Sequence, residues 1–236
     1  VSDEIEDLAP SRLGGGPGDG NGDGQPDAQQ SNIASLPLVE GGTLTIASLP
    51  GQNLSKVTAT STPARQPDSR LSFPHGTWSF EVGAGTATVT IFAPDDAIAG
   101  SYHNFGPTPG NPDPHWYEFL FDGTTGAQVL ADRVVLHFVD GQRGDHDLTA
   151  NGTIQTDGGM ANLLPALPDP EFALLEDGSL VISWESAFPG LFLERTPRPD
   201  TTPWQFTTEA AFTAGASSIV RVSPEQGTEL FRLVRP

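Results

Sequence analysis

Alternation of apolar and polar residues is the feature that most constrains how this chain can fold. In TATVTIF, residues 86–92, Ala87, Val89 and Ile91 share one face of an extended strand, and three threonines share the other face. This period of two predicts a sheet with one buried and one solvated side. No segment offers twelve residues of clean helical periodicity, so we predict an all-β fold.

Similar short runs follow one another along the chain, separated by turns that contain glycine, proline or aspartate. The first part is predicted to form strands over 43–49, 54–60, 77–83, 86–94, 115–122, 127–132 and 133–140. Six further short strands are predicted within the last 65 or so residues. Because the strands are short and joined by tight turns, we expect two antiparallel β-sandwich-like modules.

The ends of these modules are marked by changes in composition. Residues 1–37 carry seven acidic groups, one basic group and a glycine-rich tract, with few apolar side chains to bury. Three prolines stand between 162 and 172, which favours an extended linker. We therefore predict an acidic calcium-binding arm (1–37), a β-sandwich (38–161), a Pro-rich linker (162–171) and a small C-terminal β-module (172–236).

The charge of the chain excludes several classes of partner. It has 30 acidic and 11 basic side chains, a net charge of −19, which repels nucleic acid and attracts cations. No apolar run approaches the roughly 20 residues of a spanning helix, so no membrane insertion is expected. The absence of cysteine excludes disulfides, thiolate catalysis and Cys-type zinc sites. Since Val1 is neither a start methionine nor the beginning of a signal peptide, we expect a mature or excised piece.

The most specific motif is DGNGDGQPDAQQ, residues 19–30. Calcium takes six to eight oxygen ligands, and alternate residues of a twelve-residue loop can all point inward if glycine permits a sharp turn at position 6. Gly24 stands at that position. The predicted ligands are the side chains of Asp19, Asn21, Asp23 and Asp27 at positions 1, 3, 5 and 9, and the carbonyl of Gln25 at position 7.

The last position of this loop departs from the usual calcium pattern. Gln30 stands where helix-loop-helix calcium loops supply a bidentate glutamate, and an amide offers one oxygen and no charge. Either weaker binding or a ligand from elsewhere is expected. The alternative is a flexible Asp/Gly linker without a metal.

A second half-loop is suggested by VSDEIED at residues 1–7. Asp3 would take position 9 and Glu6 position 12 of a loop whose first half lies before Val1. The alternative is an acidic tail.

A further cluster follows the predicted strand at 133–140, in DGQRGDHDLTANG. Two roles remain open for it. It could be a second cation site, with the ligands Asp140, Asp145, Asp147 and Asn151, or a clamp in which Arg143 holds a carboxylate and fixes a long hairpin.

Two other classes of function are less well supported. A hydrolase would need His103, His115, Glu118 and His137 to gather with Tyr102, Trp116, Tyr117 and Asp140, but alternation in HWYEFLF places His115 and Glu118 on opposite faces of one strand. No nucleophile-elbow, zincin or phosphate-loop motif occurs, so we predict no enzymatic activity. A carbohydrate-binding module could use Trp116, Tyr117 and Trp204 as a stacking platform.

Three long segments resemble a known family: GDGNGDGQPDAQQSNIASLP, GPTPGNPDPHWYEFLFDGTTGAQV and VVLHFVDGQRGDHDLTANGTI. Residues 1 to about 158 are similar to the bacterial choice-of-anchor U domain, preceded by a calcium loop of the thrombospondin type 3 kind. The C-terminal segments look like a small β-module of exported proteins. The resemblance implies a position near the end of a large exported protein, and no catalysis.

Together these features predict a noncatalytic, calcium-stabilised structural domain, with Ca²⁺ as its cofactor. We expect it to be extracellular or on the bacterial cell surface, as an adhesin end or fibre subunit. Other surface or matrix proteins are the expected partners, including copies of itself in a fibre. The alternative is a module that tethers a larger exported protein to polysaccharide.

Overall fold

The computed structural model describes residues 1–12, 16–38, 41–60, 70–94, 97–188, 190–197, 203–223 and 229–234. Nearly all of their regular structure is β-strand, arranged in antiparallel sheets, which confirms the predicted all-β class. The chain divides into two compact units, Val1–Leu164 and Pro165–Pro236. Within the described residues, no helix has the length and apolar character needed to cross a membrane.

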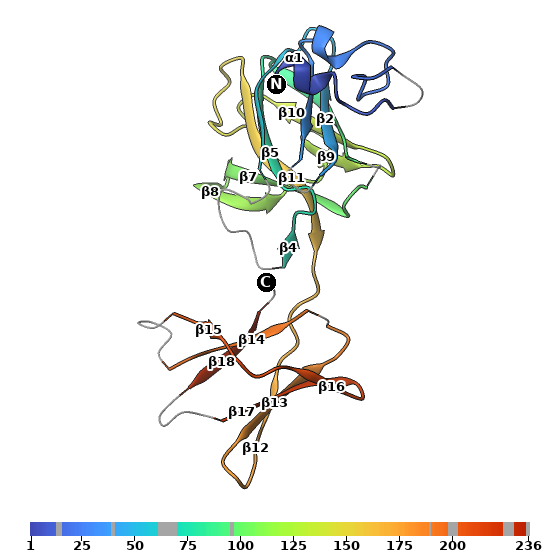
Figure 1. Ribbon diagram of the computed structural model, residues 1–236. Coiled ribbons are helices and arrows are strands. Elements are labelled where there is room, and N and C mark those ends of the chain that lie inside the picture. The colour runs from blue at the N-terminus through green and yellow to red at the C-terminus, as the bar shows by residue number, and fades with distance from the viewer. Residues whose placement is uncertain are drawn as a thin grey trace. The chain divides into compact units, whose positions relative to one another are not determined.

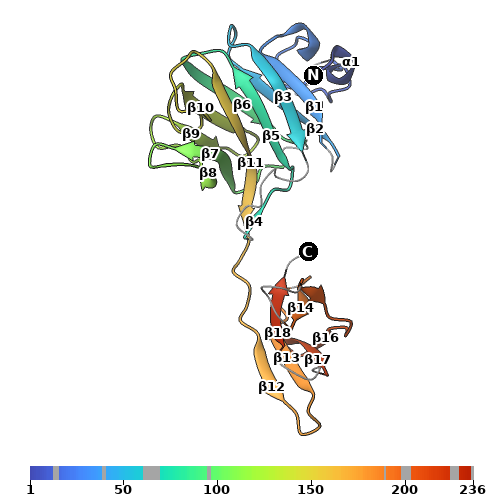
Figure 2. The same cartoon turned by 90° about the vertical axis from the view of Figure 1, so that its left-hand side faces the viewer.

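The first unit is a β-sandwich. Its five-stranded sheet has the order β1 (Ile33–Pro37), β2 (Thr43–Ser48), β6 (Thr86–Phe92), β10 (Val134–Val139) and β9 (Gly126–Val129). The second sheet has the order β3 (Leu54–Thr60), β5 (Thr77–Val82), β11 (Ile154–Leu163), β7 (Ser101–Thr108) and β8 (Asn111–Glu118), with β4 (Leu71–Ser72) paired to β11. Figures 1 and 2 show these strands from two directions.

The core lies between these two sheets because the predicted alternation holds. On β6, Ala87, Val89 and Ile91 are buried, while the threonines face outward. The other sheet contributes Trp78 and Phe80 from β5, both at most 2% exposed, to the same core. The largest side chains of this core are aromatic, and each removes a large apolar surface from water.

The structure contains strands that alternation does not indicate. The sequence pattern predicts neither β7 nor β11, and β8 begins at Asn111 rather than at 115. β11 contains Gly158 and Gly159, which lack side chains to show a pattern. At Gly158 a Cβ would lie 2.7 Å from the carbonyl oxygen of His103, so glycine allows the neighbouring strand to approach closely.

The acidic arm predicted over 1–37 does not form a separate body. Its last five residues are β1, which pairs with β2, and the preceding segment contains α1 (Asp3–Glu6) and the 3₁₀ turn η1 (Asp27–Gln29). Figure 2 shows α1 beside β1 and β2, and Ala9 is buried there. The predicted linker also differs, because its first residues complete β11 before the unit boundary.

The second unit has two smaller sheets and a core of its own, which consists of Ile182, Trp184, Leu191, Leu193, Val220, Val222 and Leu233. One sheet has the order β12 (Glu171–Leu174), β13 (Leu180–Glu185), β17 (Ser217–Val222) and β16 (Phe212–Ala214). The other has the order β15 (Gln205–Phe206), β14 (Phe192–Thr196) and β18 (Leu230–Val234).

Candidate calcium site

Residues 19–30 form a tight loop against the outer face of the five-stranded sheet. Gly22 and Gly24 both have positive φ, 75° and 90°, which glycine adopts without steric cost. Gly20 is needed for a different reason, because an added Cβ would lie 2.2 Å from Oγ1 of Thr45 on β2. The glycines therefore curl the loop and press it onto the sheet.

Asp19 organises the first half of this loop and is 1% exposed. Its Oδ1 accepts hydrogen bonds from the backbone N–H groups of Gly22 (2.8 Å) and Asp23 (3.1 Å), and its Oδ2 from that of Gly24 (2.9 Å). Three backbone donors thus hold one carboxylate inside the turn. This arrangement places a negative group at the centre of the loop, and both of its oxygens already accept backbone hydrogen bonds.

Asn21 and Asp23 repeat this pattern one step further along. Oδ1 of Asn21 accepts from the N–H of Asp23 at 3.1 Å, and Oδ1 of Asp23 accepts from the N–H of Gln25 at 2.8 Å. The side chain of Gln30 reaches the same place, with Nε2 3.2 Å from Oδ1 of Asp23 and 3.4 Å from the carbonyl of Gln25. The residues at positions 3, 5, 7 and 12 are therefore neighbours in space. Rotation of the Gln30 amide would present its oxygen instead of its nitrogen.

Asp27 joins the loop to the sandwich and is fully buried. Its Oδ2 accepts hydrogen bonds from the N–H of Gly20 (2.9 Å) and from the hydroxyl of Ser35 on β1, which is itself 2.6 Å from the hydroxyl of Thr45. Its Oδ1 is buried without a hydrogen-bond partner among the described groups. An unsatisfied buried carboxylate oxygen is costly, and a bound cation would satisfy it.

The charges of the loop act on one another. Burial raises the pKa of Asp27, the negative charges of Asp19 and Asp23 raise it further, and the hydrogen bonds from Ser35 and Gly20 oppose the rise. The exposed Asp23 behaves differently, since partial burial acts to raise its pKa but hydrogen bonds from Asn21, Gln25 and Gln30 lower it overall. A divalent cation would offset the repulsion that disfavours ionised Asp27.

The two residues of α1 that were predicted as ligands, Asp3 and Glu6, have different surroundings. Asp3 is exposed, whereas Glu6 is 7% exposed and accepts a hydrogen bond from the backbone of Ser35. Burial raises the pKa of Glu6, and the nearby charge of Asp27 adds to this. Glu6 therefore lies beside Ser35 and Asp27, which belong to the surroundings of the 19–30 loop. Of the two residues predicted as ligands of a half-loop, Asp3 alone is exposed to solvent.

In the second cluster, the aspartates predicted as ligands accept hydrogen bonds from backbone N–H groups of the same loop and of β11. Oδ2 and Oδ1 of the buried Asp145 accept from the N–H groups of Gly141 (2.9 Å) and Gln155 (3.1 Å). Asp147 accepts from the N–H of Thr149 and from the amide of Asn151, and Asp140 accepts from the N–H of Gly152. These bonds fasten the connection between β10 and β11. Oδ1 of Asp140 is buried without a described partner, but Asp140 itself is partly exposed.

The clamp proposed for Arg143 is present. Its guanidinium donates to the carboxylate of Asp122 (2.9 Å), to the carbonyl of Leu120 (2.6 Å) and to both the hydroxyl and the carbonyl of Thr125 (2.9 Å each). The carboxylate that it binds, Asp122, lies outside the cluster. Arg143 therefore links the loop after β10 to the loop between β8 and β9. Fork-shaped donation of this kind fixes geometry as well as supplying energy.

Among the described residues, no three histidine, aspartate or glutamate side chains form a group that could hold a metal. The carboxylates alone therefore make no complete centre in either cluster. A calcium loop also uses amide and carbonyl oxygens, which Asn21, Gln25 and Gln30 bring to the first cluster.

The structure brings together only some of the residues considered for catalysis: His103 on β7 pairs with Glu118 on β8. His115 lies on β8 and His137 on β10, which belong to different sheets. Trp116 packs against Phe73 and Phe105, and the guanidinium of Arg232 lies 4.3 Å from the ring centroid of Trp204. Trp116 belongs to the first unit and Trp204 to the second.

Sequence reasoning missed Ser35 and Thr45, which support Asp27 from β1 and β2. Both are polar residues within strands, and this polarity could have indicated contact with a polar group. That contact can be assigned to Asp27 only when the 19–30 loop is known to cover this face of the sheet. No protein-family model, curated protein or solved structure matches the chain.

Proposed function

We propose that this chain is a noncatalytic, calcium-stabilised structural domain of a bacterial cell-surface or extracellular assembly. The observation that supports this most directly is the fully buried Asp27, whose Oδ1 lacks a partner among the described groups. Calcium at the 19–30 loop would take oxygens from Asp19, Asn21, Asp23, Gln25, Asp27 and Gln30. The hard oxygen donors of this set suit calcium better than softer metals.

The role of calcium in this proposal is mechanical. Without a cation, three carboxylates repel one another in a loop that connects α1 to β1. With calcium, repulsion is replaced by coordination, and the hydrogen bonds from Gly20 and Ser35 to Asp27 hold the loop against β1. Calcium would thereby fasten the arm to the outer face of the sandwich. The resemblance to choice-of-anchor U domains supports a place in an exported protein.

The more specific proposal is that the domain is a fibre subunit. The structure of the sheet edges limits how such subunits could contact one another. Edge strand β3 has a register shift near Lys56, whose φ is 50°, and edge strand β8 contains Pro112 and Pro114. Irregular, charged or proline-containing edges resist pairing with another chain. Contacts within a fibre would therefore use surfaces other than these two edges.

Calcium titration calorimetry combined with limited proteolysis tests the proposal. We expect saturable binding of calcium, and cleavage within residues 1–37 only when a chelator is present, while both units stay folded. The matched variants are Asp27→Asn and Asp113→Asn, which lose the same charge, in the loop and on exposed β8 respectively. Equal cleavage with calcium and with chelator, or an unchanged heat of binding in Asp27→Asn, would contradict it.

A further inference from the structure

A cavity of about 320 Å³ lies between the outer face of the five-stranded sheet and the arm, residues 1–37. Its floor includes Thr45 and Phe92, which are paired neighbours on β2 and β6. Its other walls come from the arm, which contributes Arg12 and Asn21, and from the turn before β10, which contributes Arg133. This volume is at the lower end of the roughly 300–1,000 Å³ of small-molecule sites.

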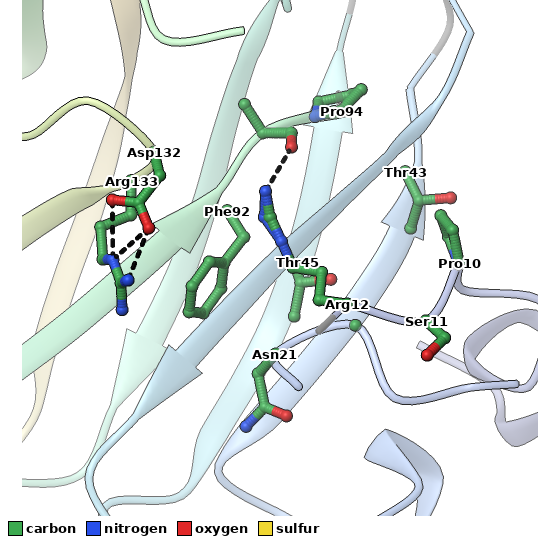
Figure 3. Close-up of a pocket in the computed structure, with 12 residues that line it drawn as sticks. Pro10, Ser11, Arg12, Asn21, Thr43, Thr45, Phe92, Pro94, Asp132 and Arg133 are labelled. Atoms are coloured by element: carbon green, nitrogen blue, oxygen red, sulfur yellow. Dashed lines mark hydrogen bonds and ion pairs between the residues drawn. The ribbon is translucent and has the colours of Figure 1, made fainter. Parts of the chain in front are cut away.

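Two arginines are fixed in this cavity by one aromatic ring. The guanidinium carbons of Arg12 and Arg133 lie 4.9 and 5.5 Å from the ring centroid of Phe92, and Figure 3 shows Phe92 between the two side chains. Nη2 of Arg12 also donates to the carbonyl of Ala93 at 3.5 Å. Two positive groups are thus held in place in a chain whose net charge is −19. Guanidinium groups fit carboxylates by paired hydrogen bonds.

The other polar groups of the cavity indicate that its ligand carries hydroxyl groups as well as a negative charge. Asp132 binds Arg133 through both carboxylate oxygens and also lines the cavity. A ligand with negative charge alone would be repelled by Asp132, whereas a hydroxyl would donate to it. The hydroxyl of Thr43 and the side chains of Ser11 and Asn21 add further groups that pair with hydroxyls.

We propose that this cavity binds a hydroxylated carboxylate, the simplest form of which is a single uronic-acid unit of a polysaccharide. The carboxylate lies against Arg12, and the ring hydroxyls face Asp132 and Thr43. This site goes beyond the structural role proposed above and does not require it. It would give the domain a chemical target on an acidic polysaccharide.

The experiment is a titration of the whole chain with galacturonate, followed by NMR. Galactose and acetate are the comparison ligands, because the first lacks the carboxylate and the second lacks the ring hydroxyls. We expect galacturonate to bind at least tenfold more tightly than either. Absence of galacturonate binding at millimolar concentration, or acetate binding of equal strength, would overturn the proposal.

Variants locate the binding. We expect Arg12→Gln to weaken galacturonate binding at least tenfold, while Lys56→Gln, which removes a positive charge from edge strand β3, leaves it unchanged. Thr43→Val removes a hydroxyl without changing side-chain size, and it should weaken galacturonate severalfold without affecting acetate. Unchanged binding in both cavity variants would overturn the assignment. Measurement with calcium and with chelator separates this result from the proposed calcium site, since Asn21 belongs to both.

Discussion

The two aspartate-rich loops of the first unit use similar residues in different ways. In the loop of residues 140–151, both oxygens of Asp145 accept backbone hydrogen bonds, so its charge is used to hold the chain. In the loop of residues 19–30, one oxygen of Asp27 accepts two bonds and the other has no described partner. A high density of aspartate therefore does not identify a cation site. The better indicator is an unsatisfied oxygen on a fully buried carboxylate, which Asp27 has, whereas the unsatisfied Oδ1 of Asp140 belongs to a partly exposed side chain.

The same substitution should have opposite effects in the two loops. In the variant Asp27→Asn, the remaining side-chain oxygen can still accept from Gly20 and Ser35, so the fold is expected to survive. The loss of a charged ligand should lower calcium affinity by at least about 100-fold, the upper end of what losing even an outer-shell partner causes. Calorimetry measures this, and circular dichroism checks the fold. Wild-type affinity in this variant would remove the distinction between the loops.

Asp145→Asn should instead destabilise the first unit. The amide nitrogen would face a backbone N–H, leaving one buried donor unsatisfied at a cost of about 1–3 kcal/mol. Chemical denaturation measures the free energy of unfolding, and calcium binding should be unchanged. The control is Asp140→Asn, where one oxygen of Asp140 is already without a described partner. If Asp140→Asn or Asp145→Asn halved the number of bound calcium ions, the second cluster would be a metal site after all.

Acidification should weaken calcium binding. Burial raises the pKa of Asp27, so this group contributes stability below its unfolded pKa, and that stability is lost as pH rises through the folded pKa. Calcium requires the ionised form. Below the raised pKa, affinity should therefore fall about tenfold for each further pH unit if one proton is displaced. Calorimetry at a series of pH values tests this, and a pH-independent affinity would contradict it.

Gly24→Ala should have the smallest effect. An added Cβ meets nothing within 4 Å, so only the positive φ of 90° opposes the change, at about 1 kcal/mol. We expect a small decrease in calcium affinity and no change in the unfolding of the second unit. Gly152→Ala, at a φ of 88° and with equal space, is the matched control in the other loop. A larger effect from Gly152→Ala on calcium binding would reverse the comparison.

Sequence patterns predict the strands in which apolar and polar residues alternate, and they miss the strands in which glycine or proline interrupts this alternation. The ranges predicted for β2, β5 and β6 match the structure closely because their residues alternate along the strand. The range predicted for β3 also matches, although its register shifts between Ser55 and Thr58. β7 and β11 escape prediction because glycine and proline interrupt the pattern, while tertiary packing still completes the hydrogen bonds.

The candidate site divides in the same way. The order of residues 19–30 is sufficient to propose a calcium loop, because all the proposed ligands are local in sequence. The support of Asp27 by Ser35 and Thr45 is not predictable, and neither is the cavity between Arg12 and Arg133, which are 121 positions apart in the numbering. Such groups meet only when the sheet has formed and the arm has folded back onto it.

The route by which the chain leaves the first unit has a mechanical consequence. β11 leads into the second unit. Its residues 154–158 pair with β5 on one side and its residues 157–161 pair with β7 on the other, so the two ladders overlap at Asp157 and Gly158. A pulling force on the C-terminal unit would enter the sandwich through this interior strand. The load would act as shear across two ladders at once rather than peeling an outer strand. Detachment would then be slow, because many hydrogen bonds must break together before the strand can slide.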